Sequence, residues 1–511
     1  MSKTLLAGYV IWGGFLLILF GLRPKSFLHG ITFENTSRAA KGLTTAVFIF
    51  TVLLCVLPMG LSPSYNGENP DYMNQYELLA ESLSNGHVYI DYDDVDPKLL
   101  ALDNPYDPEA RKAAGVSFHW DHAFYKGRYY MYFGVVPVFL LFLPYRLVTG
   151  DSLTTYHATQ VFVLLLICGI FALFYKLSKL FFKNLSLALY LTMSAAFCAV
   201  SVWYSVSAPA LYCTAISAAI CMEVWSIFFF IQAVYGSHSE KRRILLAFFG
   251  SLFGALSFGC RPPIALANLL VLPLLAEYIK RRKPTPKLIG QLALAALPYL
   301  VVGLLLMTYN YVRFDNPFEF GQSYQLTIAD QSRYGNFFSR FEPLKTLRSI
   351  GAFFAAFTPM SDQFPFVSFR GILFNFPILG FSVIGIFSKK VRRGLRETHT
   401  LPLVGFLFLL PVLIAFADVL WAPTVLERYR SDIYWLVCIL CFFITGFCYE
   451  NIPERASRVF GSLLSVLALL TICKCILLFL VPYDYNFTFY YVEKLEKIRK
   501  ILMLGRGVGL Y

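Results

Sequence analysis

The chain has 511 residues, of which 57% are hydrophobic, 17% are aromatic and 15% are charged, and its net charge is +13. A soluble protein of this length would carry about a quarter charged residues, so the composition excludes an ordinary soluble enzyme. The basic residues are distributed over short segments between apolar runs, which argues against a nucleic-acid-binding surface. We therefore expect an integral membrane protein with no nucleic-acid partner.

Apolar stretches of about 20 residues, the length that crosses a hydrocarbon core, recur from one end of the chain to the other. They predict an all-α integral membrane protein with about 12 transmembrane helices. We place these helices at residues 4–22, 43–61, 157–175, 185–203, 209–233, 244–258, 262–279, 288–311, 371–388, 400–421, 431–449 and 458–481. No internal repeat or linker is visible, so residues 1–511 are expected to form one polytopic membrane domain.

Short basic segments predict the orientation of these helices. The segments are residues 23–42, 176–183, 241–243, 280–287 and 389–396. Cytoplasmic loops of membrane proteins carry an excess of Lys and Arg, so we place all of these segments inside. Residues 62–156 then become a large acidic external loop, and residues 312–370 become a second external loop.

Two segments of the large loop are apolar or amphipathic without being expected to cross the membrane. Residues 129–149 could pass for a span, but a crossing there would place the next basic segment outside. Residues 71–84 have apolar side chains at helical spacing on one face. We expect both segments to lie along the membrane surface.

The large loop contains a pattern that is known from membrane enzymes. Asp71 stands shortly before Tyr76 and Ala80, directly after a span, and Gly86-His87-Val88-Tyr89 follows. This arrangement resembles the GT-C superfamily of glycosyltransferases, which includes aminoarabinose transferases, protein O-mannosyltransferases and oligosaccharyltransferases. Bacterial GT-C-like proteins also carry phrases similar to residues 102–107, 310–326 and 428–432 of this chain.

The resemblance implies a multi-pass enzyme of the bacterial plasma membrane. It would move a sugar from a polyprenyl-phosphate carrier to a cell-envelope acceptor at the outer face, with membrane lipids around it. Oligosaccharyltransferases have an acidic pair in their second external loop, but residues 203–210 contain no acid. No metal ligands are therefore assigned, and a divalent metal cofactor is not indicated. The oligomeric state is left open.

Such a reaction needs a carboxylate that takes a proton from the acceptor hydroxyl as it attacks. Asp71 is the first candidate for this catalytic base, Asp121 is the second, and Glu77 and Glu81 follow. Asp71 is alternatively the N-terminal cap of a helix, where a carboxylate is favoured by the helix dipole. Asp121 is alternatively a surface carboxylate.

The phosphate leaving group needs arginine at the outer membrane boundary. Arg261, Arg428, Arg430 and Arg313 are the candidates, and Tyr76 is a further substrate-binding candidate from the resemblance. Arg261 could instead reach lipid headgroups, and Arg428 or Arg430 could instead pair with Asp432 and tie two helices together. We expect Asp71, Asp121, Arg261 and Arg428 to converge on one cavity.

Two other functions remain open. The chain could be a transporter or flippase of a lipid-linked or small solute, for which ionisable residues near the bilayer midplane would be expected. Glu223, Asp418 and Lys474 are the charged exceptions inside predicted spans, and only Glu223 lies well inside its span. The chain could also be a polysaccharide polymerase or ligase, which shares a lipid-linked substrate.

Overall fold

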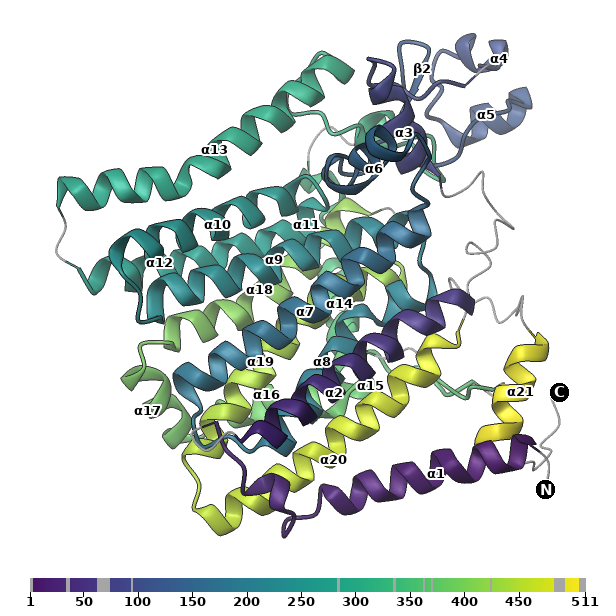
Figure 1. The fold of residues 1–511 in the computed structure, drawn as a ribbon. Coiled ribbons are helices and arrows are strands. Elements are labelled where there is room, and N and C mark those ends of the chain that lie inside the picture. The colour runs from purple at the N-terminus through teal and green to yellow at the C-terminus, as the bar shows by residue number, and fades with distance from the viewer. Residues whose placement is uncertain are drawn as a thin grey trace.

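The structure is a computed structural model that describes most of the chain. It describes residues 3–33, 37–61, 74–92, 95–282, 285–333, 337–361, 364–368, 371–422, 425–481 and 492–504. Within these ranges, ten helices are long and apolar enough to cross a membrane. The chain is therefore a multi-pass membrane protein built from a bundle of long helices (Figure 1).

Each of the ten helices overlaps a predicted span. They are α1 (Lys3–Gly21), α2 with η2 (Arg38–Leu61), α7 (Thr155–Phe181), α8 (Leu187–Ser207), α9 (Leu211–Tyr235), α11 to α12 (Pro262–Lys280), α13 (Pro286–Phe314), α18 (Leu401–Trp421), η10 with α19 (Glu427–Glu450) and α20 (Glu454–Phe479). Apolar side chains along their whole length, with few charges, explain why these segments form long helices in a bilayer.

The two remaining predicted spans differ from expectation. Residues 244–258 belong to α10 (Glu240–Phe258), whose first turn is charged, so its apolar part is short. Residues 371–388 do not form one helix but α15 (Ile372–Asn375) and α16 (Pro377–Gly385), followed by α17 (Lys389–Glu397). Pro377 lacks a backbone N–H and disfavours helix at the residue before it, which breaks the segment. At 1.5 Å per residue, α16 covers roughly 14 Å, about half of a bilayer core.

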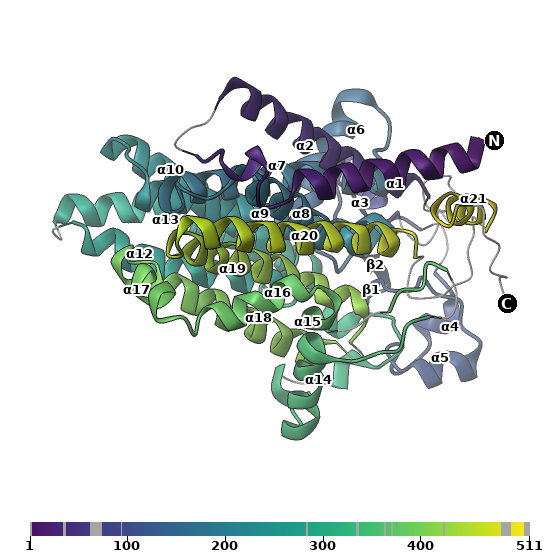
Figure 2. The same cartoon turned by 90° about the horizontal axis from the view of Figure 1, so that it is seen from below.

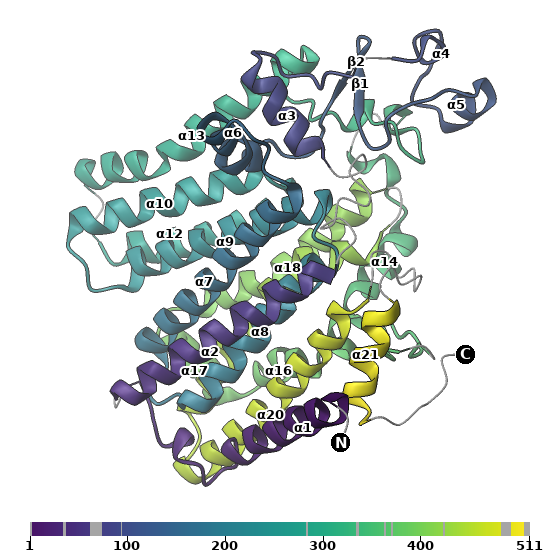
Figure 3. The same ribbon diagram turned by 45° about the vertical axis from the view of Figure 1, so that its right-hand side comes forward.

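The two large loops meet at one end of the bundle, which we call the loop end (Figures 1 and 3). Its elements are α3 (Gln75–Ser84), α4 (Pro97–Leu100), α5 (Pro108–Ala114), β1 (Ala123–Tyr125), β2 (Arg128–Tyr130), α6 (Leu143–Thr149), η7 (Gln322–Tyr324) and α14 (Pro343–Ala355). Strands β1 and β2 form an antiparallel hairpin, and β1 also bridges to Gln325 of the second loop. The Arg111 side chain donates to the Thr327 carbonyl at 2.6 Å, which further joins the loops.

The described residues of the predicted basic segments gather at the opposite end, which we call the basic end (Figure 1). The Asn184 side chain donates to Glu450 at 2.6 Å, and the Tyr235 hydroxyl donates to the His399 carbonyl at 3.2 Å. Figure 2 shows the long helices running between the two ends, with α17 at one end and β1 and β2 at the other. The arrangement agrees with the grouping of loops that the basic residues predicted.

Residues 129–149 contain no helix of spanning length. Their apolar helical part, Val138–Thr149, has 12 residues, or roughly 18 Å of helix, which is too short to cross a bilayer core. The helix predicted at 71–84 is described from Gln75 onward, as α3, and Asp71 lies outside the described residues. Whether these helices lie along a membrane surface remains a prediction.

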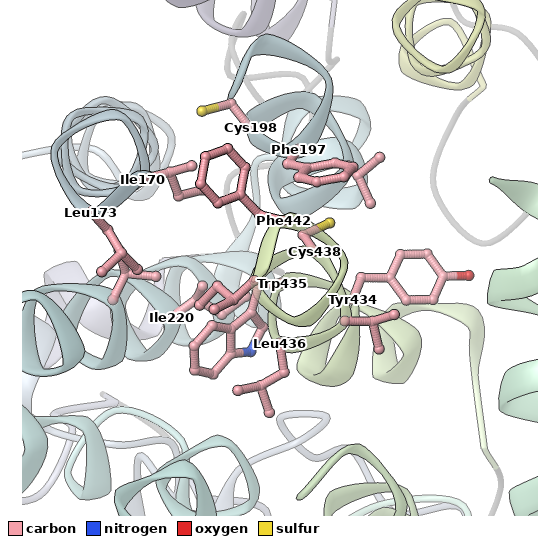
Figure 4. Packing of buried hydrophobic residues seen from close by; sticks show 14 of the residues in the cluster. Ile170, Leu173, Phe197, Cys198, Ile220, Tyr434, Trp435, Leu436, Cys438 and Phe442 are labelled. Carbon is pink, nitrogen blue, oxygen red and sulfur yellow. The ribbon is translucent and has the colours of Figure 1, made fainter. Parts of the chain in front are cut away.

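The core lies between α7, α8, α9 and α19, where aromatic and branched side chains interlock (Figure 4). Phe174 of α7 stacks on Phe442 of α19, with ring centroids 4.0 Å apart. Helices α8 and α19 are almost wholly buried, which makes them the centre of the bundle. This rigid centre holds the loop-end termini of α9 and α19 in fixed positions.

Candidate functional site

A cavity of about 400 Å³ lies where the loop end meets the bundle. Its walls come from the β1–β2 region, the start of α9, the turn between α10 and α11, the end of α13, the end of α18, and η10 (Glu427–Arg430). The charged side chains that line it are Asp121, Arg261, Arg313, Asp418 and Arg428. Three of the four residues expected to converge are therefore brought together, and Asp71 lies outside the described residues.

Asp121 is buried in the cavity wall and is not a surface carboxylate, since only 7% of the residue is exposed. Its backbone has a φ of 54°, which turns the chain from Trp120 into β1. The Tyr212 hydroxyl donates to one carboxylate oxygen, and the Gln325 side-chain amide donates to the other at 3.1 Å. A helix of the bundle and the second loop therefore both hold this carboxylate in place.

Arg261 forms a two-pronged ion pair with Asp432, the second residue of α19. Its Nε lies 2.8 Å and its Nη2 lies 2.7 Å from the same carboxylate oxygen, Oδ2. The Asp432 side chain is fully buried and that of Arg261 is 15% exposed. Arg261 therefore does not reach out to lipid headgroups but pairs with Asp432. Such a pair fixes the direction of the guanidinium that lines the cavity.

Asp418, near the end of α18, lines the cavity, although the sequence indicates it only as a charge inside a predicted span and not as a site residue. Its carboxyl group is fully buried, lines the cavity and interacts with that of Asp432. The charges of Arg261 and Arg428 act on the Asp432 carboxyl group. Two carboxyl groups and two guanidinium groups thus lie together in one cluster beside the cavity.

Arg428 lies against the ring of Tyr212, with its guanidinium carbon 4.0 Å from the ring centroid. A cation that lies above the face of an aromatic ring is attracted to the ring electrostatically. Because Tyr212 also donates to Asp121, one tyrosine connects the candidate base with a candidate phosphate-binding residue. Arg430 does not line the cavity and forms an ion pair with Glu427.

Arg313, the weakest arginine candidate from the sequence, also faces the cavity. It is 4% exposed, and its two terminal nitrogens donate to the Met131 carbonyl at 2.7 Å and to the Asn310 side chain at 2.6 Å. Its guanidinium carbon lies 4.1 Å from the centroid of the Tyr309 ring. It therefore adds positive charge to the cavity and anchors the end of α13 to the loop after β2.

Glu77 and Tyr76 lie on α3 but do not line the cavity. Glu77 accepts hydrogen bonds from the backbone nitrogen of Thr155 at 2.7 Å and from its hydroxyl at 3.1 Å, so it caps the start of α7. Burial raises the pKa of Glu77.

Tyr76 is fully buried and stacks on Phe142, and Glu81 pairs with Arg146 at 2.8 Å. All three side chains have structural roles in docking α3.

His122 is a buried titratable residue next to Asp121. The Trp120 carbonyl lies 2.8 Å from its Nδ1, so Nδ1 carries the proton and Nε2 accepts from the Tyr92 hydroxyl at 2.9 Å. Burial lowers the pKa of His122 from its usual 6.5 to about 4, and the backbone hydrogen bond opposes this only in part. His122 is therefore neutral at pH 7.

We expect His122 to make the loop end sensitive to acid. The unfolded chain binds a proton below about pH 6.5, whereas the folded protein does so only near pH 4, so stability falls as the pH drops between these values. The loss between pH 7 and pH 5 should be about 2 kcal/mol. Thermal unfolding should show a smaller acid sensitivity in His122→Gln than in the wild type. The exposed-histidine control His157→Gln should behave like the wild type. An unchanged acid sensitivity in His122→Gln would contradict this assignment.

The residues that complete the site carried weak signals in the sequence. Tyr212 and Gln325 are polar groups within apolar or aromatic segments, and nothing local indicates that they meet Asp121. Asp418 was visible as a charge at the end of an apolar span, which is costly without a partner and is the one usable signal. Within the described ranges, no group of three or more His, Cys, Asp or Glu residues is placed to hold a metal ion.

Comparisons with known proteins identify no relative of this chain. No protein-family model, curated protein or solved structure matches the chain. The fold and the site therefore define its class as a multi-pass membrane protein with a charged cavity at one end of the helix bundle.

Proposed function

We propose that the protein is a glycosyltransferase that moves a sugar from a polyprenyl-phosphate carrier to a cell-envelope acceptor. This proposal rests on one cavity at the junction of polar loops and apolar helix ends, whose lining combines Asp121 and Asp418 with three arginines. A long-chain carrier stays in the bilayer, because each buried CH₂ contributes about 0.8 kcal/mol. Its phosphate must therefore react at headgroup height, where the ends of spanning helices lie.

Asp121 is proposed as the general base. It accepts hydrogen bonds from Tyr212 and Gln325, which orient both carboxylate oxygens. An acceptor hydroxyl entering the cavity would give its proton to this carboxylate as it attacks the anomeric carbon. The bond from that carbon to the carrier phosphate breaks through an oxocarbenium-like state, as in glycoside hydrolysis.

The arginines are proposed to stabilise the departing phosphate. Arg428 and Arg313 line the cavity and are positioned by aromatic rings, and Arg261 is held by Asp432. Guanidinium groups bind phosphate oxygens through paired hydrogen bonds, and they act more strongly in a site shielded from water. The three residues supply charge where negative charge develops.

The position of the charges favours an enzyme over a transporter. Glu223, the ionisable residue deepest within a span, accepts hydrogen bonds from the Asn268 amide at 2.6 Å and from the Ser257 hydroxyl. These contacts give it a role in joining α9 to α10 and to η6 (Leu266–Leu270). A polysaccharide polymerase or ligase remains the alternative, and the size of the transferred glycan distinguishes it.

The test is transfer by the purified full-length chain in lipid discs. Polyprenyl-phosphate sugars are supplied with a cell-envelope extract as acceptor, and release of polyprenyl phosphate and the mass of the glycosylated product are measured. Release that depends on both the protein and the acceptor supports the proposal. Movement of intact lipid-linked sugar across the bilayer without release would contradict it and would support a flippase.

Replacing Arg428 by alanine should weaken binding of polyprenyl phosphate by about 10-fold to 100-fold, since a charge-assisted hydrogen bond is lost. Arg428→Lys should restore binding only in part, because lysine lacks the planar fork. Arg128 is a matched control, because it is exposed at the loop end and stacks on Tyr89 at 4.1 Å. Arg128→Ala should bind normally, and equal losses in both alanine variants would contradict the assignment.

A further inference from the structure

A second hollow, of about 490 Å³, lies at the basic end of the bundle. The helix ends that form it are far from the loop end in Figure 1. It is formed where the start of α10, the end of α12 (Val271–Lys280) and the start of α13 meet. The residues that line it are Glu240, Arg243, Arg281, Arg282, Thr285, Leu288 and Gln291. Three arginines from two separate segments therefore share one hollow.

Contacts with the protein hold the three guanidinium groups in place. Arg243 donates from Nε to the His238 carbonyl at 2.8 Å, and Arg282 donates from Nη1 to the Tyr278 carbonyl at 2.9 Å. Arg281 donates from Nε to Glu277 at 2.6 Å. Each guanidinium has five N–H donors, so these contacts do not use all of them. The groups are thus oriented before any ligand arrives.

The charges in the hollow are not balanced by its acidic residues. Glu277 is engaged by Arg281, and Glu240 by Lys287 at 3.1 Å and by Gln291 at 2.8 Å. Burial lowers the pKa of Arg282, and the positive charges of Arg243 and Arg281 lower it further. Like charges held together in this way are stabilised by an anion.

The surroundings favour a ligand that is part lipid. Leu288 is buried in the wall of the hollow, while Leu245, two residues after Arg243 on α10, and Ile289, one residue after Leu288 on α13, are 54% and 67% exposed. The same end of the molecule carries the basic segments that lie next to the anionic leaflet in membrane proteins. Exposed apolar side chains follow further along both helices, at Phe249 of α10 and at Leu294 and Leu297 of α13.

We propose that this hollow is a binding site for a phosphate group, supplied by the headgroup of an anionic phospholipid whose acyl chains lie along α10 and α13. The site does not depend on the proposed transferase function. The same chemistry would accept free phosphate, so the test must separate the two sources.

The test uses the full-length chain in detergent with phosphatidylglycerol, phosphatidylcholine and inorganic phosphate as probes. Native mass spectrometry measures retained lipid, and thermal unfolding measures stabilisation. The wild type should retain phosphatidylglycerol at least about tenfold better than phosphatidylcholine, and Arg282→Gln should lose about tenfold or more of that binding. Arg282→Lys keeps the charge and should lose less of the phosphatidylglycerol binding. If the glutamine variant folds poorly, binding by Arg282→Lys is measured in its place.

The control is Arg393→Gln on α17, also at the basic end, where the side chain is 82% exposed and pairs with Glu397. It should retain lipid like the wild type. Inorganic phosphate could instead stabilise the wild type but not Arg282→Gln, while the wild type shows no preference between the two lipids. This result would support the phosphate site and assign it to a free ligand. Equal lipid retention by the wild type, Arg282→Gln and Arg282→Lys, with no effect of phosphate, would overturn the proposal.

Discussion

Replacing Asp121 by asparagine is expected to slow sugar transfer by about 10²–10⁴-fold, because the acceptor hydroxyl loses its general base. The protein should still fold, since asparagine has nearly the same volume and tolerates the φ of 54° at this position. Its side-chain oxygen can still accept from the Tyr212 hydroxyl, and the Gln325 amide can turn to present its oxygen to the new NH₂ group. Release of polyprenyl phosphate under saturating donor measures the effect.

Asp315 provides a matched control for this substitution. It also has a φ of 54° and lies at the loop end, but it is exposed and pairs with Lys126 at 2.7 Å. Asp315→Asn should therefore leave transfer unchanged. Full activity in Asp121→Asn would place the base elsewhere, and Asp71→Asn would then be the next variant to measure.

The ion pair between Arg261 and Asp432 is expected to carry the largest effect on stability. Arg261→Met should destabilise the protein by about 3–5 kcal/mol, because it leaves the fully buried Asp432 without its cation. Thermal unfolding of the purified protein measures this loss. The exposed pair between Lys345 and Glu342 is the control, and Lys345→Met should change stability little.

The double variant Arg261→Met/Asp432→Leu separates structure from function. Removing both charges takes away the unpaired buried group, so most of the stability should return. Transfer should stay low, because the guanidinium that faces the cavity is missing. Normal transfer by the double variant would mean that Arg261 serves only to tie α11 (Pro262–Ala265) to α19.

Apolar runs and basic segments are enough to predict which segments become long helices and how their ends are grouped. A bilayer requires about 20 apolar residues per crossing and internal hydrogen bonds for every backbone group, so such runs have few alternatives. The prediction of one span at residues 371–388 is wrong, because Pro377 breaks this apolar segment into two short helices. The basic segments at 280–287 and 389–396 lie at the same end of the bundle, as their charge indicated.

Which side chains meet in the cavity follows from the packing of the helices and loops and cannot be read from the sequence. Arg261 and Asp432 are 171 positions apart, and Asp121 and Gln325 are 204 apart. The sequence placed Arg428 and Arg430 nearest to Asp432, but Asp432 lies in the first turn of α19 and faces the turn before α11. Periodicity along a helix shows which face is apolar, whereas the partner of a polar side chain depends on how distant helices pack. That packing depends on the shapes of many buried side chains together, such as Phe174 against Phe442. It therefore cannot be predicted from any one segment of the sequence.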